Sequence, residues 1–296
     1  MNIEPNVPRG ALVIVAGVDI NARVTVYEIV AYGPGYESWG LEFGYINEDP
    51  FKERLWEELD ERVCNRTFTC SDGERMPVHK VAIDSGFATE RVYRFTAKRP
   101  FRTIAIKGRG RGLDIPFLYT NPTHTKGAVR TTLQELNVDA GKAMITYWFD
   151  KVKAPGPGFC HLPSKDGHPV NGYGSQYDQE LQSEELLYTS KGGSHALSWK
   201  KMSSRRNEAL DVRLYAYGAL LYSRFKLERL RRDLIRKDRK DGGSPFGARQ
   251  AEMPDNIDQV RIRKLRSHDA YAYGPYGAIK LPGSASGFGA SNWPLT

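Results

Sequence analysis

A nearly continuous apolar run over residues 11–19, ALVIVAGVD, constrains the fold of this chain more than any other feature, and it ends in an acid. Such a run is typical of a strand buried on both faces of a sheet. Residues 23–32 are rich in β-branched and aromatic side chains and follow a short turn at residues 21–22, a pattern that indicates a hairpin. After Gly33-Pro34-Gly35, residues 38–46 supply a third strand. We therefore expect three consecutive antiparallel strands.

Helices and strands alternate along the next part of the chain. Asp49-Pro50 precedes a helix with one apolar face, because proline is tolerated in the first helical turn. Residues 78–84 then favour a strand, residues 89–98 a helix and residues 102–107 another strand. A strand–helix–strand unit of this length implies parallel pairing through a right-handed crossover.

A long helix is predicted from Arg205 to Lys240, where leucine and aromatic residues recur on one face. This order of elements is that of a ribonuclease H-like fold. We therefore expect an α/β domain over residues 11–240, with a ribonuclease H-like mixed sheet flanked by helices and a long C-terminal helix. Residues 1–10 are expected to form a linker. Residues 241–296, rich in Gly, Ser, Pro and Tyr, are expected to form a flexible tail.

The composition excludes several classes of protein. The 296 residues are 40% hydrophobic, enough for one large or two modest cores. The sequence contains neither a membrane-spanning apolar run nor a secretory signal. Three cysteines argue against a disulfide framework and for a reducing compartment inside a cell. Cys64 and Cys70, with His79 nearby, fit no common zinc-finger spacing.

The formal net charge of +8 favours a polyanionic partner such as DNA. Positive charge gathers over residues 98–111, 200–206 and 224–240, whereas residues 42–61 are acidic. Such an uneven distribution suggests a binding face.

Three aspartates are the candidate catalytic residues. Asp19 and Asp84 each end an apolar strand, and ligands of open α/β sheets bind beyond the carboxyl ends of adjacent strands. Asp211 lies near the start of the long predicted helix, where Asn207 and Glu208 share its face. Converging carboxylates repel unless one takes up a proton or divalent cations bind between them. Taken singly, each acid is more often a turn residue, a cap or a solvated side chain.

Several short motifs, in order, resemble the large-terminase nuclease of lambda-like tailed phages over roughly residues 11–222. The motifs are Gly17-Val18-Asp19, Gly33-Pro34-Gly35 with Glu37-Ser38-Trp39, Ile83-Asp84-Ser85-Gly86 with Val92-Tyr93, Ile106-Lys107-Gly108, Pro157-Gly158 with His161-Leu162-Pro163, and Arg206-Asn207-Glu208-Ala209-Leu210-Asp211 with Tyr215-Ala216. Two positions depart from the family pattern. Phe87 stands where a second glycine is common, and Leu162 stands where Phe is frequent.

The resemblance implies an endodeoxyribonuclease that cuts concatemeric double-stranded viral DNA during genome packaging in the host cytoplasm. Asp19, Asp84 and Asp211 would hold Mg²⁺ or Mn²⁺, with two ions as the expectation, because all-oxygen ligation favours these metals. The implied partners are DNA, the small terminase subunit and the capsid portal, to which the tail could dock. The chain contains no phosphate-binding loop of the G-x-x-x-x-G-K-[ST] type, so we expect no ATPase motor in it.

Other residues support this interpretation less directly. Lys107, Arg109, Arg205 and Arg206 are candidates for phosphate contacts, although exposed cations in surface loops are also common. Glu208, Asn207 and His161 are secondary candidates for the site, and a structural role is favoured for His161. Glu28, on the second strand, is a candidate for a fourth carboxylate of the site, but the favoured expectation is that it faces solvent.

Two alternatives remain open. One is another ribonuclease H-like phosphoryl-transfer enzyme, such as a transposase or a junction resolvase. The other is an inactive DNA-binding or capsid-docking remnant of a prophage, in which the acids are structural.

Overall fold

Strand β1 (Val13–Ile20) lies near the middle of a nine-stranded mixed sheet. The structure is a computed structural model that describes residues 7–125, 128–191, 194–202, 206–240, 271–274 and 277–280. The strand order is β7-β8-β6-β5-β1-β2-β3-β9, and β4 pairs with the outer part of β5. The other strands of this sheet are β2 (Thr25–Tyr32), β3 (Ser38–Ile46), β4 (Thr67–Thr69), β5 (Arg75–Asp84), β6 (Thr103–Arg109), β7 (Thr123–His124), β8 (Thr132–Asn137) and β9 (Cys160–His161).

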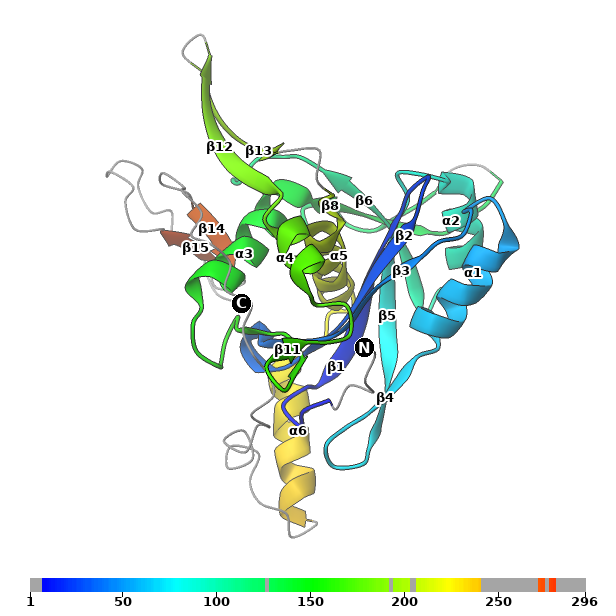
Figure 1. The fold of residues 1–296 in the computed structure, drawn as a ribbon, viewed down its shortest axis with the longest axis vertical. Helices are drawn as coiled ribbons and strands as arrows, with labels where there is room; N and C mark the ends of the chain where they lie inside the picture. The colour runs from blue at the N-terminus through cyan, green and yellow to red at the C-terminus, as the bar shows by residue number, and fades with distance from the viewer. Residues whose placement is uncertain are drawn as a thin grey trace.

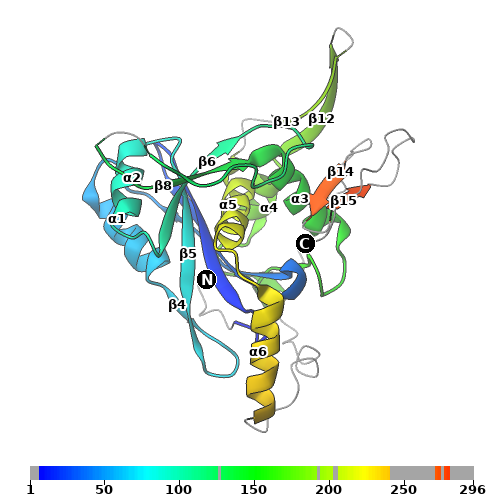
Figure 2. The same cartoon turned by 180° about the vertical axis from the view of Figure 1, so that it is seen from behind.

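The pairing directions confirm the predicted change from antiparallel to parallel strands. Strands β1, β2 and β3 are antiparallel neighbours, whereas β5 runs parallel to β1, β6 to β5 and β8 to β6. Three further pairs of strands lie outside the sheet: β10 (Ser164–Lys165) with β11 (His168–Pro169), β12 (Glu184–Lys191) with β13 (Ser194–Lys201), and β14 (Tyr271–Gly274) with β15 (Gly277–Lys280). Figures 1 and 2 show the β12–β13 hairpin extending away from the main body.

Helices cover both faces of the sheet and give it two separate cores. Helix α1 (Glu53–Leu59), a π-helical turn over Asp60–Cys64 and α2 (Thr89–Ala97) lie on one face (Figure 1). Helices α3 (Val138–Lys151), α4 (Ser175–Leu181) and α5 (Glu208–Tyr222) lie on the other. No helix in the described ranges is long and apolar enough to cross a bilayer.

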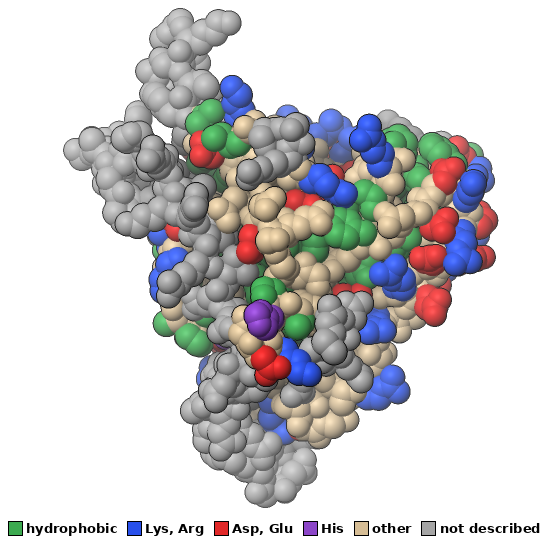
Figure 3. All heavy atoms as spheres, in the orientation of Figure 1, with side chains coloured by type: hydrophobic (Ala, Val, Ile, Leu, Met, Phe, Trp, Pro, Cys, Tyr) green, Lys and Arg blue, Asp and Glu red, His purple; other side chains and the backbone are tan. Residues whose placement is uncertain are grey.

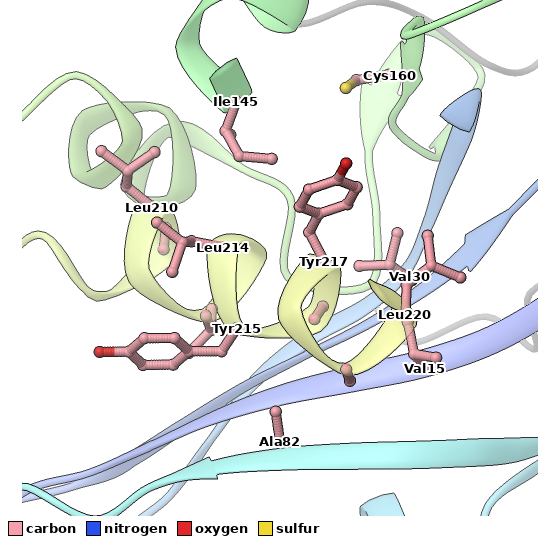
Figure 4. Close-up of a cluster of buried hydrophobic side chains, with 14 of the residues drawn as sticks. Val15, Val30, Ala82, Ile145, Cys160, Leu210, Leu214, Tyr215, Tyr217 and Leu220 are labelled. Carbon is pink, nitrogen blue, oxygen red and sulfur yellow. The ribbon is translucent and has the colours of Figure 1, made fainter. Parts of the chain in front are cut away.

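Helix α5 is almost entirely enclosed, which explains its lack of a polar face. Leu210, Leu214 and Leu220 pack with Val15, Val30 and Ile145 in a buried cluster between α5, the sheet and α3 (Figure 4). At Gly17 the helix crosses β1 so closely that a Cβ atom would stand 2.0 Å from the Val212 carbonyl oxygen. Glycine in the Gly17-Val18-Asp19 motif therefore brings α5 onto the strand beside Asp19.

The prediction of one long C-terminal helix was wrong. Helix α5 ends at Tyr222 and a second helix, α6 (Leu227–Lys240), begins after a four-residue break. Arg224 has a φ of 52°, a left-handed conformation that terminates helices, and the ring of Phe225 packs 4.4 Å from that of His79 on β5. This tertiary contact draws the chain off the helical path that its periodicity predicted.

The expectation that Glu28 faces solvent was also wrong. Glu28 and Arg213 are fully buried and form an ion pair of 2.6 Å between β2 and α5. The hydroxyl groups of Tyr173 and Tyr177 each donate a hydrogen bond of 3.0 Å to the same Glu28 oxygen. Loss of one partner of such a pair would leave an uncompensated buried charge, so the pair fixes the position of α5 on the sheet.

The chain ends fall largely outside the described residues. Val7 is buried and forms a bridge with Cys70, while residues 1–6 of the expected linker are outside the described part. The expected tail over residues 241–296 is likewise outside it, apart from strands β14 and β15.

Candidate active site: an acidic cluster at the strand ends

Asp19 and Asp84 stand side by side at the carboxyl ends of two neighbouring parallel strands. Val18 on β1 is paired with Ile83 on β5, and each aspartate is the next residue along its strand. Asp19 shares a face of the sheet with Gly17, which contacts α5, and Asp84 shares a face with Ala82, which belongs to the α5 core. Both carboxylates therefore project toward α5.

Asp211 completes the cluster from α5. Because α5 crosses β1 at Gly17, its first turns pass beside the ends of β1 and β5. Burial and then the charges of Asp211, Asp84 and Glu208 raise the pKa of Asp19 from 3.8 to about 7. The structure thus brings together the three predicted aspartates and the secondary candidate Glu208.

Burial is also the main cause of a raised pKa at the other two aspartates, Asp84 and Asp211. The pKa of Asp84 is partly lowered again by two neighbours. The Gly86 N–H donates a 2.9 Å hydrogen bond to its carboxylate, and Lys107 contributes a positive charge. For Asp211, the charge of Lys142 lowers the pKa in part. Buried Tyr215, one turn after Asp211, has a pKa well above 10 because of burial and these same carboxylates.

Two residues of the cluster were not predicted from the sequence. The ammonium of Lys142 on α3 donates to both carboxylate oxygens of Glu184 at 2.8 Å and lies 2.9 Å from Asp211 Oδ1. Asn207, a predicted secondary candidate, donates to Asp211 Oδ2 at 3.2 Å and also to Glu184. A lysine within the otherwise apolar run of α3 was a usable signal, since buried lysines are almost always paired. Nothing local to the sequence identified its partners.

The donor set suits a hard divalent cation. Carboxylate oxygens are the ligands that Mg²⁺ and Mn²⁺ prefer, and a bound cation would relieve the repulsion that raises the pKa of Asp19. Within the described ranges, however, no three Asp, Glu, His or Cys side chains are arranged to hold one metal ion directly. Lys142 and Asn207 engage both oxygens of Asp211 instead. The residues fit the cation in chemistry and charge, while their present positions are those of an ion-paired cluster.

The predicted phosphate contacts have different surroundings. Lys107 is half-buried beside Asp84, whose pKa its charge affects. Arg109 is exposed and pairs with Glu135 at 3.3 Å, and Arg206 is 3.2 Å from Glu208 and 3.6 Å from Glu180. Arg205 lies outside the described residues.

His161 is not brought to the cluster. In the sheet, His161 on β9 is paired with Trp39 on β3, and Trp39 is paired with Ala31 on β2. Ala31 is in turn paired with Ile14 at the start of β1. Ile14 lies about 16 Å along β1 from Asp19. His161 is buried, lies 2.7 Å from Glu37 and stacks on Trp39 at 5.1 Å. These contacts agree with the structural role that the sequence favoured.

Comparison with known proteins gives a consistent result. The model of the family described as terminase large subunit gpA, endonuclease domain, matches residues 3–232. The chain is 27% identical over 226 residues to the terminase large subunit of Escherichia phage lambda and 26% identical over 223 residues to that of Enterobacteria phage P21. Each alignment covers 73% of this chain and 33% of the relative, so the chain spans about one third of the length of these proteins. Since the family match extends over most of the chain and includes all three aspartates, the protein belongs to the terminase large subunit gpA endonuclease domain family.

Proposed function

We propose that this chain is a metal-dependent endonuclease that cuts double-stranded viral DNA during genome packaging. One observation carries the proposal: Asp19 and Asp84 end neighbouring parallel strands, and Asp211 on α5 lies close enough to raise the pKa of Asp19. Ionisable residues whose pKa values are shifted by burial and by neighbouring charges occur at functional sites more often than elsewhere. Membership of the family supports the same activity.

In this proposal Asp19, Asp84 and Asp211 hold Mg²⁺ or Mn²⁺, with two ions as the expected number. When bound, such ions activate a water molecule and stabilise the leaving oxygen of a phosphodiester. The chain itself contributes the positioning. Gly17 admits α5, and the buried pair of Glu28 and Arg213 fixes it, so that the Asp211 carboxylate is held near the strand ends. The arrangement of β1, β2, β3 and β5 supports assignment to the ribonuclease H-like group of folds.

The proposed substrate is bound mainly through its phosphates. Lys107, whose charge lowers the pKa of Asp84, and the half-exposed Arg206, which pairs with Glu208, are described cations beside the acidic cluster. We include the small terminase subunit and the capsid portal as proposed partners, because the relatives are terminase large subunits. Since the alignments cover only 33% of each relative, activities of the remaining parts are not assigned to this chain.

The test is cleavage of supercoiled plasmid by the purified chain in Mg²⁺, Mn²⁺ or EDTA. We expect nicking that requires the metal and falls by at least about 100-fold in Asp19→Asn, while DNA affinity stays within about threefold. Asp166→Asn, an exposed aspartate in the β10–β11 turn, is the matched control and should cut at the wild-type rate.

The outcome separates the remaining interpretations. Metal-dependent cleavage that survives Asp19→Asn would contradict the assigned site. Intact plasmid in every metal, together with normal DNA binding, would favour an inactive binding or docking module. Strand transfer or preference for a four-way junction would favour a transposase-like or resolvase-like enzyme.

A further inference from the structure

Lys142 on α3 places its ammonium among the carboxylates of the acidic cluster. Its ammonium has three N–H groups, and three carboxylate oxygens lie within 2.9 Å: both oxygens of Glu184 and Oδ1 of Asp211. Its side chain is 9% exposed, and those of Glu184 and Asp211 are 7% and 17% exposed. The charge is therefore fixed inside the acidic cluster.

The fold holds the lysine there through its neighbour Gly141. A Cβ atom at Gly141 would stand 2.7 Å from Leu214 of α5 and 2.6 Å from the ring of Phe117. Glycine thus lets α3 approach α5 closely enough for Lys142 to reach a residue on α5.

Asp211 has no oxygen left without a hydrogen-bond donor. Lys142 engages Oδ1 and Asn207 donates to Oδ2, and both donors also bind Glu184. The two donors draw Asp211 toward Glu184, at the base of the β12–β13 hairpin. A cation that uses Asp211 as a ligand must compete with a positive charge already in contact with it.

We propose that Lys142 is a built-in counter-cation of the acidic cluster, which holds Asp211 against Glu184 and must release Asp211 when a divalent cation binds. This inference rests on the proposed function, because it concerns the metal of that same site. Lys142 is in this sense a positioning residue that sets the affinity for metal. It makes the cluster stable without metal and weakens metal binding at the same time.

The test measures Mn²⁺ binding without DNA and without turnover. Free Mn²⁺ is followed by electron paramagnetic resonance during titration of the full chain, wild type and Lys142→Met. We expect Lys142→Met to bind Mn²⁺ at least about tenfold more tightly, because a positive charge next to a divalent ion is removed. The variant should also melt at lower temperature than wild type in EDTA and regain the difference in excess Mn²⁺.

Two further variants control for charge and for folding. Lys142→Arg keeps the charge and should bind Mn²⁺ within about threefold of wild type. Lys142→Gln removes the charge but keeps an amide donor for Glu184, so it carries the test if the Met variant does not fold. Unchanged or weaker Mn²⁺ binding by the uncharged variants overturns the inference.

The two proposals fail in different ways. If wild type binds Mn²⁺ and nicks plasmid but the uncharged variants bind no more tightly, the counter-cation role of Lys142 is wrong and the nuclease assignment stands. If neither wild type nor the uncharged variants bind Mn²⁺, both proposals are wrong.

Discussion

The Asp19 carboxyl keeps its proton to a higher pH than a free aspartate, and this couples the stability of the fold to pH. Its pKa is about 7 in the folded chain against a usual value of 3.8. Between these values the folded chain carries a proton that the unfolded chain has lost, so the free energy of unfolding falls as the pH rises from about 4 to about 7. The difference between the two pKa values corresponds to roughly 4 kcal/mol.

Asp19→Asn should therefore stabilise the metal-free protein at high pH. We expect the free energy of unfolding in EDTA at pH 8 to rise by roughly 2–4 kcal/mol, and by less than half of that at pH 5. Denaturant unfolding at the two pH values measures both changes. An equal gain at pH 5 and pH 8 would mean that the pKa of Asp19 is not raised.

At this scale the sequence predicted the acids better than their neighbours. Asp19 and Asp84 were found because a buried strand that ends in an acid is a local pattern. Lys142 and Glu184 were missed because their contact depends on how closely α3 packs on α5, and 42 residues separate them along the chain. Glu28 was assigned to solvent because an isolated acid on a strand carries no sign of its partner Arg213 on α5.

Among the elements, α5 is held in position by a close backbone contact with β1. At Gly17 an added Cβ would lie 2.0 Å from the Val212 carbonyl oxygen and 2.5 Å from the Ala216 nitrogen, and both are backbone atoms. No side-chain rotation can relieve this contact, so the helix itself must move.

Gly17→Ala should thus destabilise the fold and also disturb the acidic cluster. We expect a loss of about 3 kcal/mol or more in the free energy of unfolding, since overpacking against backbone is costly. Cleavage should be reduced even in the molecules that remain folded, because α5 carries Asp211. Gly174→Ala is the control: nothing lies within 4 Å of a Cβ at that position, and its effect should stay below about 1 kcal/mol. Equal unfolding free energies for the two variants would contradict the close crossing of α5 over β1.

The elements themselves were largely predictable, and the exception is informative. The first three strands, β5, α2 and β6 lie where apolar runs and periodicity placed them. The 36-residue helix was wrong because periodicity continues through Ser223–Lys226, whereas the contact of Phe225 with His79 is tertiary. The sequence pattern therefore predicts whether a segment is a helix or a strand more reliably than it predicts where that element is interrupted.

For the whole molecule, the distribution of charge decides where DNA would approach. On the flank of α1 and α2, Lys and Arg side chains are intermixed with Asp and Glu (Figure 3), and the pairs include Arg54 with Glu58 and Arg94 with Glu90. Such exposed pairs contribute little to stability and present no uniform positive surface. The positive runs of the sequence, over residues 98–111, 200–206 and 224–240, lie elsewhere on the chain.

Salt dependence can show whether Lys107 belongs to the DNA-binding face. We expect Lys107→Gln to weaken plasmid-fragment binding and to lower the slope of log affinity against log salt by about 1, the value for one lost phosphate contact. Fluorescence anisotropy in EDTA between low and moderate salt measures the slope. Lys165→Gln, an exposed lysine on β10, should leave it unchanged. Identical slopes for the two variants would remove Lys107 from the interface.

The acidic cluster draws its residues from β1, β5, α3, β12 and α5, so it spans the chain from Asp19 to Asp211. Contacts between residues so distant in sequence form late, because long loops must close first. A nascent or partly folded chain therefore holds these carboxylates apart, and the proposed cutting activity cannot precede completion of the fold.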